Sequence, residues 1–226
     1  MSVKDKRLAA SDEYWHKRAE LFSQAYSAKD LLLQPNKAFL RQRQVAIARY
    51  IPDDPAATVL DAGCGSGEFV AILAQRCKHV IGVDYSAIMI DLARKSSPPP
   101  NTEFHQADCA NMPVADHSVD YLFSMGLLDY LPDLDAVLRE FRRVSKPGAM
   151  VVFTVPKTPS IFEPFRWSAA VRGALFKIPP LVNILSRRRL DALLQGHDMT
   201  AVDVTSLWTT MWIVRARINA SPGATL

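Results

Sequence analysis

Three glycines, each separated from the next by one residue, follow a short apolar segment near residue 60. Asp61 ends that segment, Gly63, Gly65 and Gly67 come next, and a helix is predicted to begin at Glu68. Glycines in a turn between a strand and a helix let a ligand approach the main chain, because no Cβ stands in the way. This pattern predicts a ligand site at the end of the strand.

The spacing of the glycines and the residue after them restrict the ligand. A dinucleotide fingerprint has two residues before its third glycine, and a small residue where this chain has Glu68. A carboxylate in the first helical turn also occupies the electropositive end that a pyrophosphate would use. Both features disfavour NAD and FAD. A ligand with a positive centre and no phosphate, such as S-adenosylmethionine, is compatible with Asp61 and Glu68.

Further polar residues follow the next apolar runs. Asp84 is placed where a carboxylate accepts both ribose hydroxyls, and Tyr85 beside it is expected to lie against the adenine. Asp108 is expected to accept from an exocyclic amine, while neighbouring amides meet the edge of the ring. Ser124, Met125 and Gly126 are expected to form the floor beneath the sulfonium.

Apolar runs and amphipathic segments alternate between residues 57 and 156, which predicts a parallel sheet with crossover helices. The predicted strands are Ala57–Asp61, His79–Asp84, Glu103–Ala107, Val119–Ser124 and Met150–Val155. The predicted helices between them are Glu68–Arg76, Ala87–Lys95 and Asp133–Ser145, the last capped by Gly148. Outside this core we expect helices Asp12–Tyr26, Lys37–Ile51 and Arg187–Gly196, and strands Thr200–Leu207 and Thr210–Arg217.

The composition is that of an ordinary folded protein. The chain has 226 residues, of which 49% are hydrophobic and 22% charged, enough for one α/β domain over residues 1–226. Within it we distinguish N-terminal helices (1–52), a core (57–156), a basic apolar insert (157–186) and a closing part (187–217). The three cysteines lack a Cys-x-x-Cys pair, so neither a disulfide scaffold nor a metal site is expected. No secretion signal or membrane-spanning run is found, which predicts a cytoplasmic protein.

Five sequence blocks together resemble the class I S-adenosylmethionine-dependent methyltransferases. They are Asp-Ala-Gly-Cys-Gly-Ser-Gly (61–67), Gly-Val-Asp-Tyr-Ser (82–86), Ala-Asp-Cys-Ala-Asn-Met-Pro (107–113), Val-Asp-Tyr-Leu-Phe-Ser (119–124) and Arg-Arg-Val-Ser-Lys-Pro-Gly (142–148). The resemblance implies a Rossmann-like, doubly wound α/β fold with N-terminal covering helices. Its seven-stranded mixed sheet would have the order 3-2-1-4-5-7-6, with strand 7 antiparallel. Within the family, the chain is most similar to the small-molecule group of ubiquinone-pathway and magnesium-protoporphyrin methyltransferases.

The residues and the resemblance together give a predicted cofactor site for S-adenosylmethionine. Its members are Asp61, Gly63, Cys64, Gly65, Gly67, Asp84, Tyr85, Met89, Asp108, Cys109 and Ser124. The two cysteines are expected to act through backbone amides, and Met89 has the alternative of a core residue. No metal is expected.

Methyl transfer from a sulfonium is an in-line displacement whose leaving group needs no protonation. The enzyme has mainly to align the acceptor, and a base is needed only when the acceptor is a weak acid. The predicted catalytic residues are Asp129 and Tyr130, after the fourth strand. Many relatives have histidine in this stretch, so the Asp-Tyr pair departs from the family pattern. Asp129 has the alternative of a cap for the next helix.

Residues 157–190 hold seven basic residues against one acidic residue, in a chain whose net charge is only +4. Read as a helix, Pro164–Ile178 gathers Trp167, Val171 and Leu175 on one face, with arginine and lysine beside it. Such a segment is typical of a membrane-interface helix or of a lid over a lipophilic acceptor; plain packing is the alternative.

We therefore expect a methyltransferase acting on a small, lipophilic molecule. For residues 161–178, peripheral contact with the inner face of the membrane is one of the alternatives. Two alternatives are an RNA methyltransferase and a non-catalytic partner subunit that binds the cofactor. The Asn/Asp-Pro-Pro-aromatic block of amino-methylating nucleic-acid enzymes is replaced by Ser-Met-Gly-Leu at residues 124–127, and no DNA substrate is expected.

Overall fold

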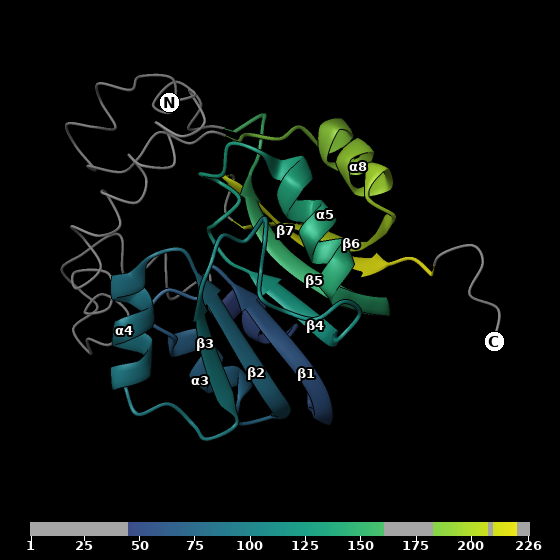
Figure 1. The fold of residues 1–226 in the computed structure, drawn as a ribbon. Coiled ribbons are helices and arrows are strands. Elements are labelled where there is room, and N and C mark those ends of the chain that lie inside the picture. The colour runs from purple at the N-terminus through teal and green to yellow at the C-terminus, as the bar shows by residue number, and fades with distance from the viewer. Residues whose placement is uncertain (1–44, 161–182, 208–209, 221–226) are drawn as a thin grey trace, which may run out of the picture.

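A computed structural model describes residues 45–160, 183–207 and 210–220 of the chain (Figure 1). Seven strands form one sheet in the order β3-β2-β1-β4-β5-β7-β6, which confirms the expected order. The strands are β1 (Asp54–Ala62), β2 (Cys77–Asp84), β3 (Thr102–Gln106), β4 (Val119–Ser124), β5 (Ser145–Pro156), β6 (Met199–Leu207) and β7 (Met211–Ile218). All neighbours are parallel except β7, which is antiparallel to both β5 and β6.

The sheet reverses its winding at β1. On one side Asp61 is in register with Gly82 of β2, and on the other side with Phe123 of β4. The chain winds outward from β1 to β3 and then returns to β4. In open α/β sheets the crevice for ligands lies at the carboxyl ends of the strands at such a reversal. The glycine turn after Asp61 stands at this position.

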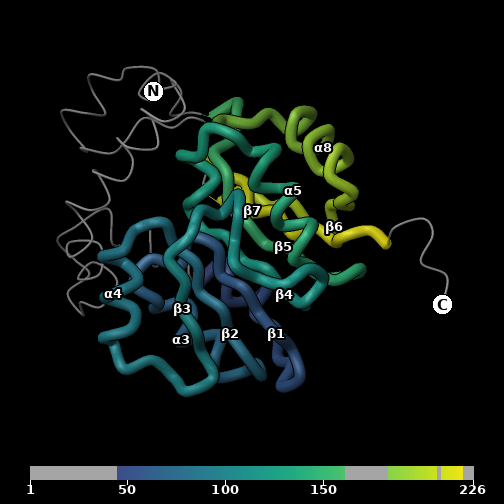
Figure 2. Tube along the Cα trace, in the orientation of Figure 1, coloured from purple at the N-terminus to yellow at the C-terminus, as the bar shows by residue number. Residues whose placement is uncertain are grey.

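Helices cover both faces of the sheet (Figures 1 and 2). They are α3 (Glu68–Leu73), α4 (Ala87–Lys95), α5 (Leu134–Val144) and α8 (Arg187–Gly196). Buried residues of α3 and α4 pack in one core cluster, and those of α5 and α8 in a second. Polar residues fix the starts of three helices, because Ser86, Asp133 and Ser186 accept from backbone N–H groups three residues on.

Two predicted helix ends differ from the structure. Helix α3 ends at Leu73 rather than at residue 76. Helix α5 ends at Val144, so the predicted cap by Gly148 is wrong, although Gly148 does have a positive φ of 84°. The N–H groups of His117 and Ser118 donate to the carbonyls of Arg143 and Val144, each at 2.9 Å, and so satisfy the helix end.

Gly148 lies instead in an irregular part of β5. Ser145 pairs with Val119, and the next regular pair is Tyr121 with Met150, so β5 contains extra residues between them. No described helix is long and apolar enough to span a membrane. The predicted helix Asp12–Tyr26, most of Lys37–Ile51 and the segment 161–178 lie outside the described residues.

Candidate cofactor and acceptor site

The glycine turn is held against β2 and leaves one glycine open. The N–H groups of Gly63 and Cys64 both donate to the carbonyl of Val83, at 2.7 and 3.0 Å. Gly65 and Gly67 have φ of 54° and 84°, a region that favours glycine. A Cβ on Gly67 would lie 3.1 Å from its neighbours in the core, whereas a Cβ on Gly65 would meet no atom within 4 Å. Gly67 therefore serves packing, and Gly65 leaves room for a ligand.

Asp84 connects the glycine turn to the start of α4. Its Oδ2 accepts the N–H of Gly65 at 2.9 Å, and its Oδ1 accepts the N–H of Ser86 at 2.9 Å. The carboxylate is thus oriented by the backbone at the end of β2, next to the most open point of the turn.

Asp108 is brought beside Asp84 by the pairing of β2 with β3. Asp84 is in register with Gln106, and the N–H of Ala107 donates to the Asp84 carbonyl at 3.0 Å. Asp108 itself begins a turn, in which its Oδ1 accepts the N–H of Ala110 at 2.9 Å. Tyr85, adjacent to Asp84, is 49% exposed. The three side chains predicted to bind an adenosine therefore lie at the ends of two neighbouring strands or directly after them.

Carboxylates and two neutral thiols lie together behind the turn. Asp61 is only 2% exposed. Burial, and then the charges of Asp84 and Asp61, raise the pKa of the Cys64 thiol well above its ordinary value. Burial, followed by Asp84 and Asp108, does the same to the pKa of Cys109. The thiols are therefore protonated at neutral pH and carry no charge, and the carboxylates beside them favour a cationic ligand.

The first turn of α3 carries a carboxylate, as the sequence predicts. The Ser66 hydroxyl donates to the two oxygens of Glu68 at 2.8 and 2.9 Å. Burial nevertheless raises the pKa of Glu68 above its ordinary value. A carboxylate at this helix start opposes an anionic phosphate. Within the described parts of the chain, no group of three histidine, cysteine or acidic residues could hold a metal ion.

Two predicted cofactor residues are buried, and their roles remain predictions. The side chain of Met89 lies in the core, while its N–H is bonded to the cap residue Ser86. Ser124 is fully buried, and its hydroxyl has no hydrogen-bond partner among the described residues. The chain after Ser124 is held by Thr154 in β5, whose hydroxyl accepts the N–H of Gly126 at 2.8 Å. Sequence reasoning missed Thr154, although a threonine in an apolar strand was an available signal.

The loop after β4 carries the predicted catalytic residues. Asp129 is 5% exposed, and Tyr130 is half-buried. The alternative of Asp129 as a helix cap is wrong, because Asp133 caps α5 by accepting the N–H of Ala136 at 2.9 Å. The loop follows the strand next to β1, so it lies at the same edge of the sheet as the glycine turn.

Asn183 ties this loop to the chain that follows the basic insert. Its side-chain amide donates to the carbonyls of Leu128 and Leu131 at 2.7 and 2.6 Å, and its N–H donates to the Asp129 carbonyl at 3.2 Å. Asn183 was not predicted. The available signal was a single amide within the apolar run Leu181–Leu185.

These features fit S-adenosylmethionine. The structure gathers at the carboxyl ends of the strands an open glycine, two carboxylates oriented by backbone N–H groups, and a helix start whose Glu68 disfavours a phosphate. The predicted residues brought together by the turn and the ends of β1, β2 and β3 are Asp61, Gly63, Cys64, Gly65, Asp84, Tyr85, Asp108 and Cys109.

Comparison with known proteins gives consistent matches. Residues 60–153 match the family described as a methyltransferase domain. Magnesium-protoporphyrin O-methyltransferase of Rhodobacter capsulatus is 32% identical over 167 residues, covering 68% of this chain and 70% of that protein. Trans-aconitate 2-methyltransferase of Azoarcus sp. (strain BH72) is 37% identical over 134 residues, covering 55% of this chain and 51% of that protein.

The fold is also similar to a solved structure. Magnesium protoporphyrin IX methyltransferase from Synechocystis PCC 6803, with bound S-adenosylhomocysteine, superposes with a TM-score of 0.72 at 15% identity, over 93% of this chain and 99% of that one. Among the first curated relatives that it matches, this chain spans 39–51% of their own length.

Proposed function

Because the chain belongs to the class I S-adenosylmethionine-dependent methyltransferase family, we propose that it transfers a methyl group from this cofactor to a small molecule. One observation carries the proposal: the Asp84 carboxylate is bonded to the N–H of Gly65, at the open point of the glycine turn. The names of the two relatives above refer to small-molecule acceptors, which supports an acceptor of that class.

The residues of the site have separable tasks. When bound, S-adenosylmethionine supplies an electrophilic methyl group on a positively charged sulfur. Asp84 accepts from the ribose hydroxyls, Asp108 accepts from the adenine amine, and Gly65 leaves space for the ligand. The acidic residues Asp61 and Glu68 lower the electrostatic cost of a cationic ligand. The main contribution to rate is then alignment of the acceptor in a site shielded from water.

Asp129 and Tyr130 serve the acceptor in this proposal. The Asp129 carboxylate takes a proton from a hydroxyl or carbon acid, or holds a cationic amine, depending on the acceptor. Asn183 fixes the carbonyls on both sides of Asp129 and so limits the movement of this loop. A loop held at three points is suited to aligning an acceptor.

We further propose that the acceptor is lipophilic. The support is the sequence of residues 161–178, which predicts a helix face with Trp167 and other apolar residues, flanked by arginine and lysine. Trp167→Asp is expected to weaken sedimentation with liposomes of anionic lipid and to lower methylation of extracted lipids. Steep salt dependence of RNA binding, with no effect of Trp167→Asp, would favour an RNA substrate instead.

A transfer assay tests the proposed activity. The protein is incubated with cofactor tritiated on the methyl group and a cell extract, which is then separated into lipid, small-molecule, protein and RNA fractions. We expect label in the small-molecule or lipid fraction, and loss of that label with Asp84→Ala. Binding of the cofactor without transfer to any fraction would favour the non-catalytic partner subunit.

A further inference from the structure

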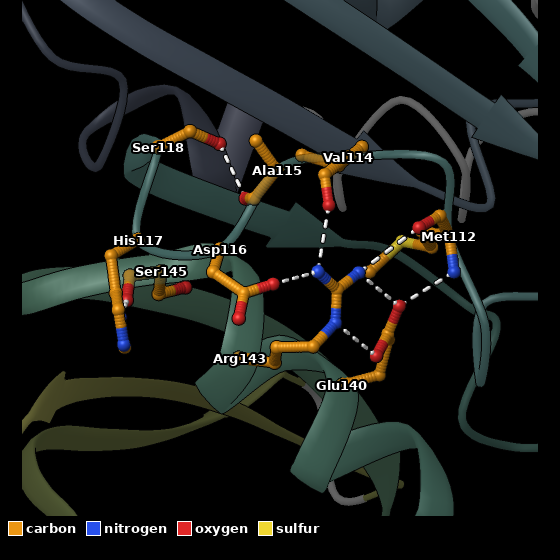
Figure 3. Close-up of polar contacts among 9 residues, drawn as sticks. All are labelled: Met112, Val114, Ala115, Asp116, His117, Ser118, Glu140, Arg143 and Ser145. Carbon is orange, nitrogen blue, oxygen red and sulfur yellow. Dashed lines mark hydrogen bonds and ion pairs between the residues drawn. The ribbon is translucent and has the colours of Figure 1, made fainter.

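Arg143 in α5 is the centre of a hydrogen-bonded network that fixes the loop after Asp108 (Figure 3). Its Nε donates to Oε2 of Glu140 at 2.8 Å, and its Nη2 donates to Oε1 at 2.6 Å. The same guanidinium donates to the carbonyls of Val114 and Met112, at 2.8 and 3.0 Å. Glu140 also accepts the N–H of Met112 at 2.6 Å. Met112 is therefore held through both its N–H and its carbonyl.

The network is charged and largely buried on the Glu140 side. The Glu140 side chain is 9% exposed, whereas Asp116, which also pairs with Arg143, is 67% exposed. Burial by itself would raise the pKa of Glu140, but hydrogen bonds from Arg143 and Met112 outweigh burial and lower it. Bidentate contacts between arginine and a carboxylate are strong and directional, so this pair fixes the loop in one position.

The fixed point lies four residues after Asp108. On the other side of Asp108, the N–H of Ala107 is bonded to the carbonyl of Asp84 at 3.0 Å. Between the two fixed points, Asp108 forms a turn in which its carbonyl accepts the N–H of Asn111 at 2.8 Å. The direction of the Asp108 carboxylate thus depends on β2 at one end of the segment and on α5 at the other.

We propose that Glu140 and Arg143 are positioning residues for adenine recognition by Asp108. The inference rests on the proposed function, because it requires that the adenosine lies beside Asp84 and Asp108. A purely structural role would alter stability or weaken all ligands alike. A positioning role alters the preference for a purine that carries an amine at the place where Asp108 accepts.

The experiment compares S-adenosylhomocysteine with S-inosylhomocysteine, in which an oxygen replaces the purine amine. Dissociation constants for both are measured by calorimetry on the full chain, with Glu140→Gln and Arg143→Lys as variants. The control is His197→Gln, which removes a 2.9 Å contact between Nε2 of His197 and Asp135. Asp135 lies in the first turn of α5, the helix that also carries Glu140 and Arg143. That variant perturbs α5 without touching the loop.

We expect the wild type to prefer the adenosine compound about tenfold or more, as for a hydrogen bond to a charged acceptor. Glu140→Gln and Arg143→Lys should reduce this preference several-fold, whereas His197→Gln should retain it despite a lower melting temperature. Glu140→Gln is nearly isosteric and still accepts from Met112, so it decides the matter if Arg143→Lys fails to fold.

Two results would overturn the inference. One is an unchanged purine preference in Glu140→Gln, even if both compounds bind more weakly. The other is a wild type that binds both compounds equally, which removes the role of Asp108. Failure of the wild type to bind either compound refutes the proposed function itself, and with it the inference.

Discussion

Gly65 and Gly148 form a matched pair for testing the glycine turn. They have φ of 54° and 84°, and a Cβ at either position would meet no atom within 4 Å. Alanine at either place therefore adds backbone strain without a clash inside the protein. Left-handed backbone costs a non-glycine residue about 1–2 kcal/mol. For a chain of this size, each variant should lower the melting temperature by about 2–8 °C.

The two glycines differ in their surroundings. Gly65 is bonded to Asp84 in the candidate cofactor site, whereas Gly148 lies in the irregular part of β5. A methyl group on Gly65 occupies space that the ligand requires, and such overpacking costs about 1–3 kcal/mol. That cost corresponds to a loss of affinity of about 5- to 150-fold. Gly148→Ala should leave affinity within about twofold of the wild type.

Calorimetric titration with S-adenosylhomocysteine, together with thermal unfolding, measures both effects on both variants. We expect similar losses of stability and a loss of affinity confined to Gly65→Ala. If Gly65→Ala binds as tightly as Gly148→Ala, the ligand does not approach this turn and the reasoning is refuted.

Three further predictions concern Asp84, Glu68 and the buried cysteines. Asp84→Asn should weaken cofactor binding by about 2 kcal/mol in the same titration. The control is Asp120→Asn, which also removes a carboxylate bonded to a backbone N–H and should leave the affinity for the cofactor unchanged. Burial raises the pKa of Glu68, so its ionised form destabilises the fold at pH 7. Glu68→Gln should therefore raise the melting temperature at pH 7. This gain should disappear below about pH 4, where Glu68 is protonated in both the folded and the unfolded protein, and an equal gain at pH 3 would contradict the prediction. Burial raises the pKa of all three cysteines, Cys64, Cys77 and Cys109. In the native protein they should therefore resist iodoacetamide at pH 8, and rapid modification measured by intact mass would contradict this.

Much of the sheet could be predicted because its signals are local. The strand Val119–Ser124 and the helices Ala87–Lys95 and Arg187–Gly196 have the predicted bounds. The strand is a short apolar run, and the two helices are amphipathic segments that each begin after a capping serine. The order of the strands could be predicted only from the resemblance to a family, because the spacing of the segments does not say on which side of β1 the strand β4 pairs.

The remaining differences depend on contacts between distant residues. Helix α5 ends at Val144 because its last carbonyls accept from His117 and Ser118, which precede the helix by many residues. Asn183 and the loop at Leu128 are likewise far apart in the sequence but in contact in the fold. Glu140 and Arg143 are three residues apart and could be recognised as a pair, but their loop partner Met112 could not.

The central claim is that S-adenosylmethionine lies over the glycine turn with its ribose at Asp84. A crystal structure of the protein with S-adenosylhomocysteine tests it most directly. The account predicts ribose hydroxyls within hydrogen-bond distance of the Asp84 carboxylate and the purine amine directed to Asp108. Density for this compound at another place, or a turn that binds a pyridine dinucleotide in its stead, would contradict it.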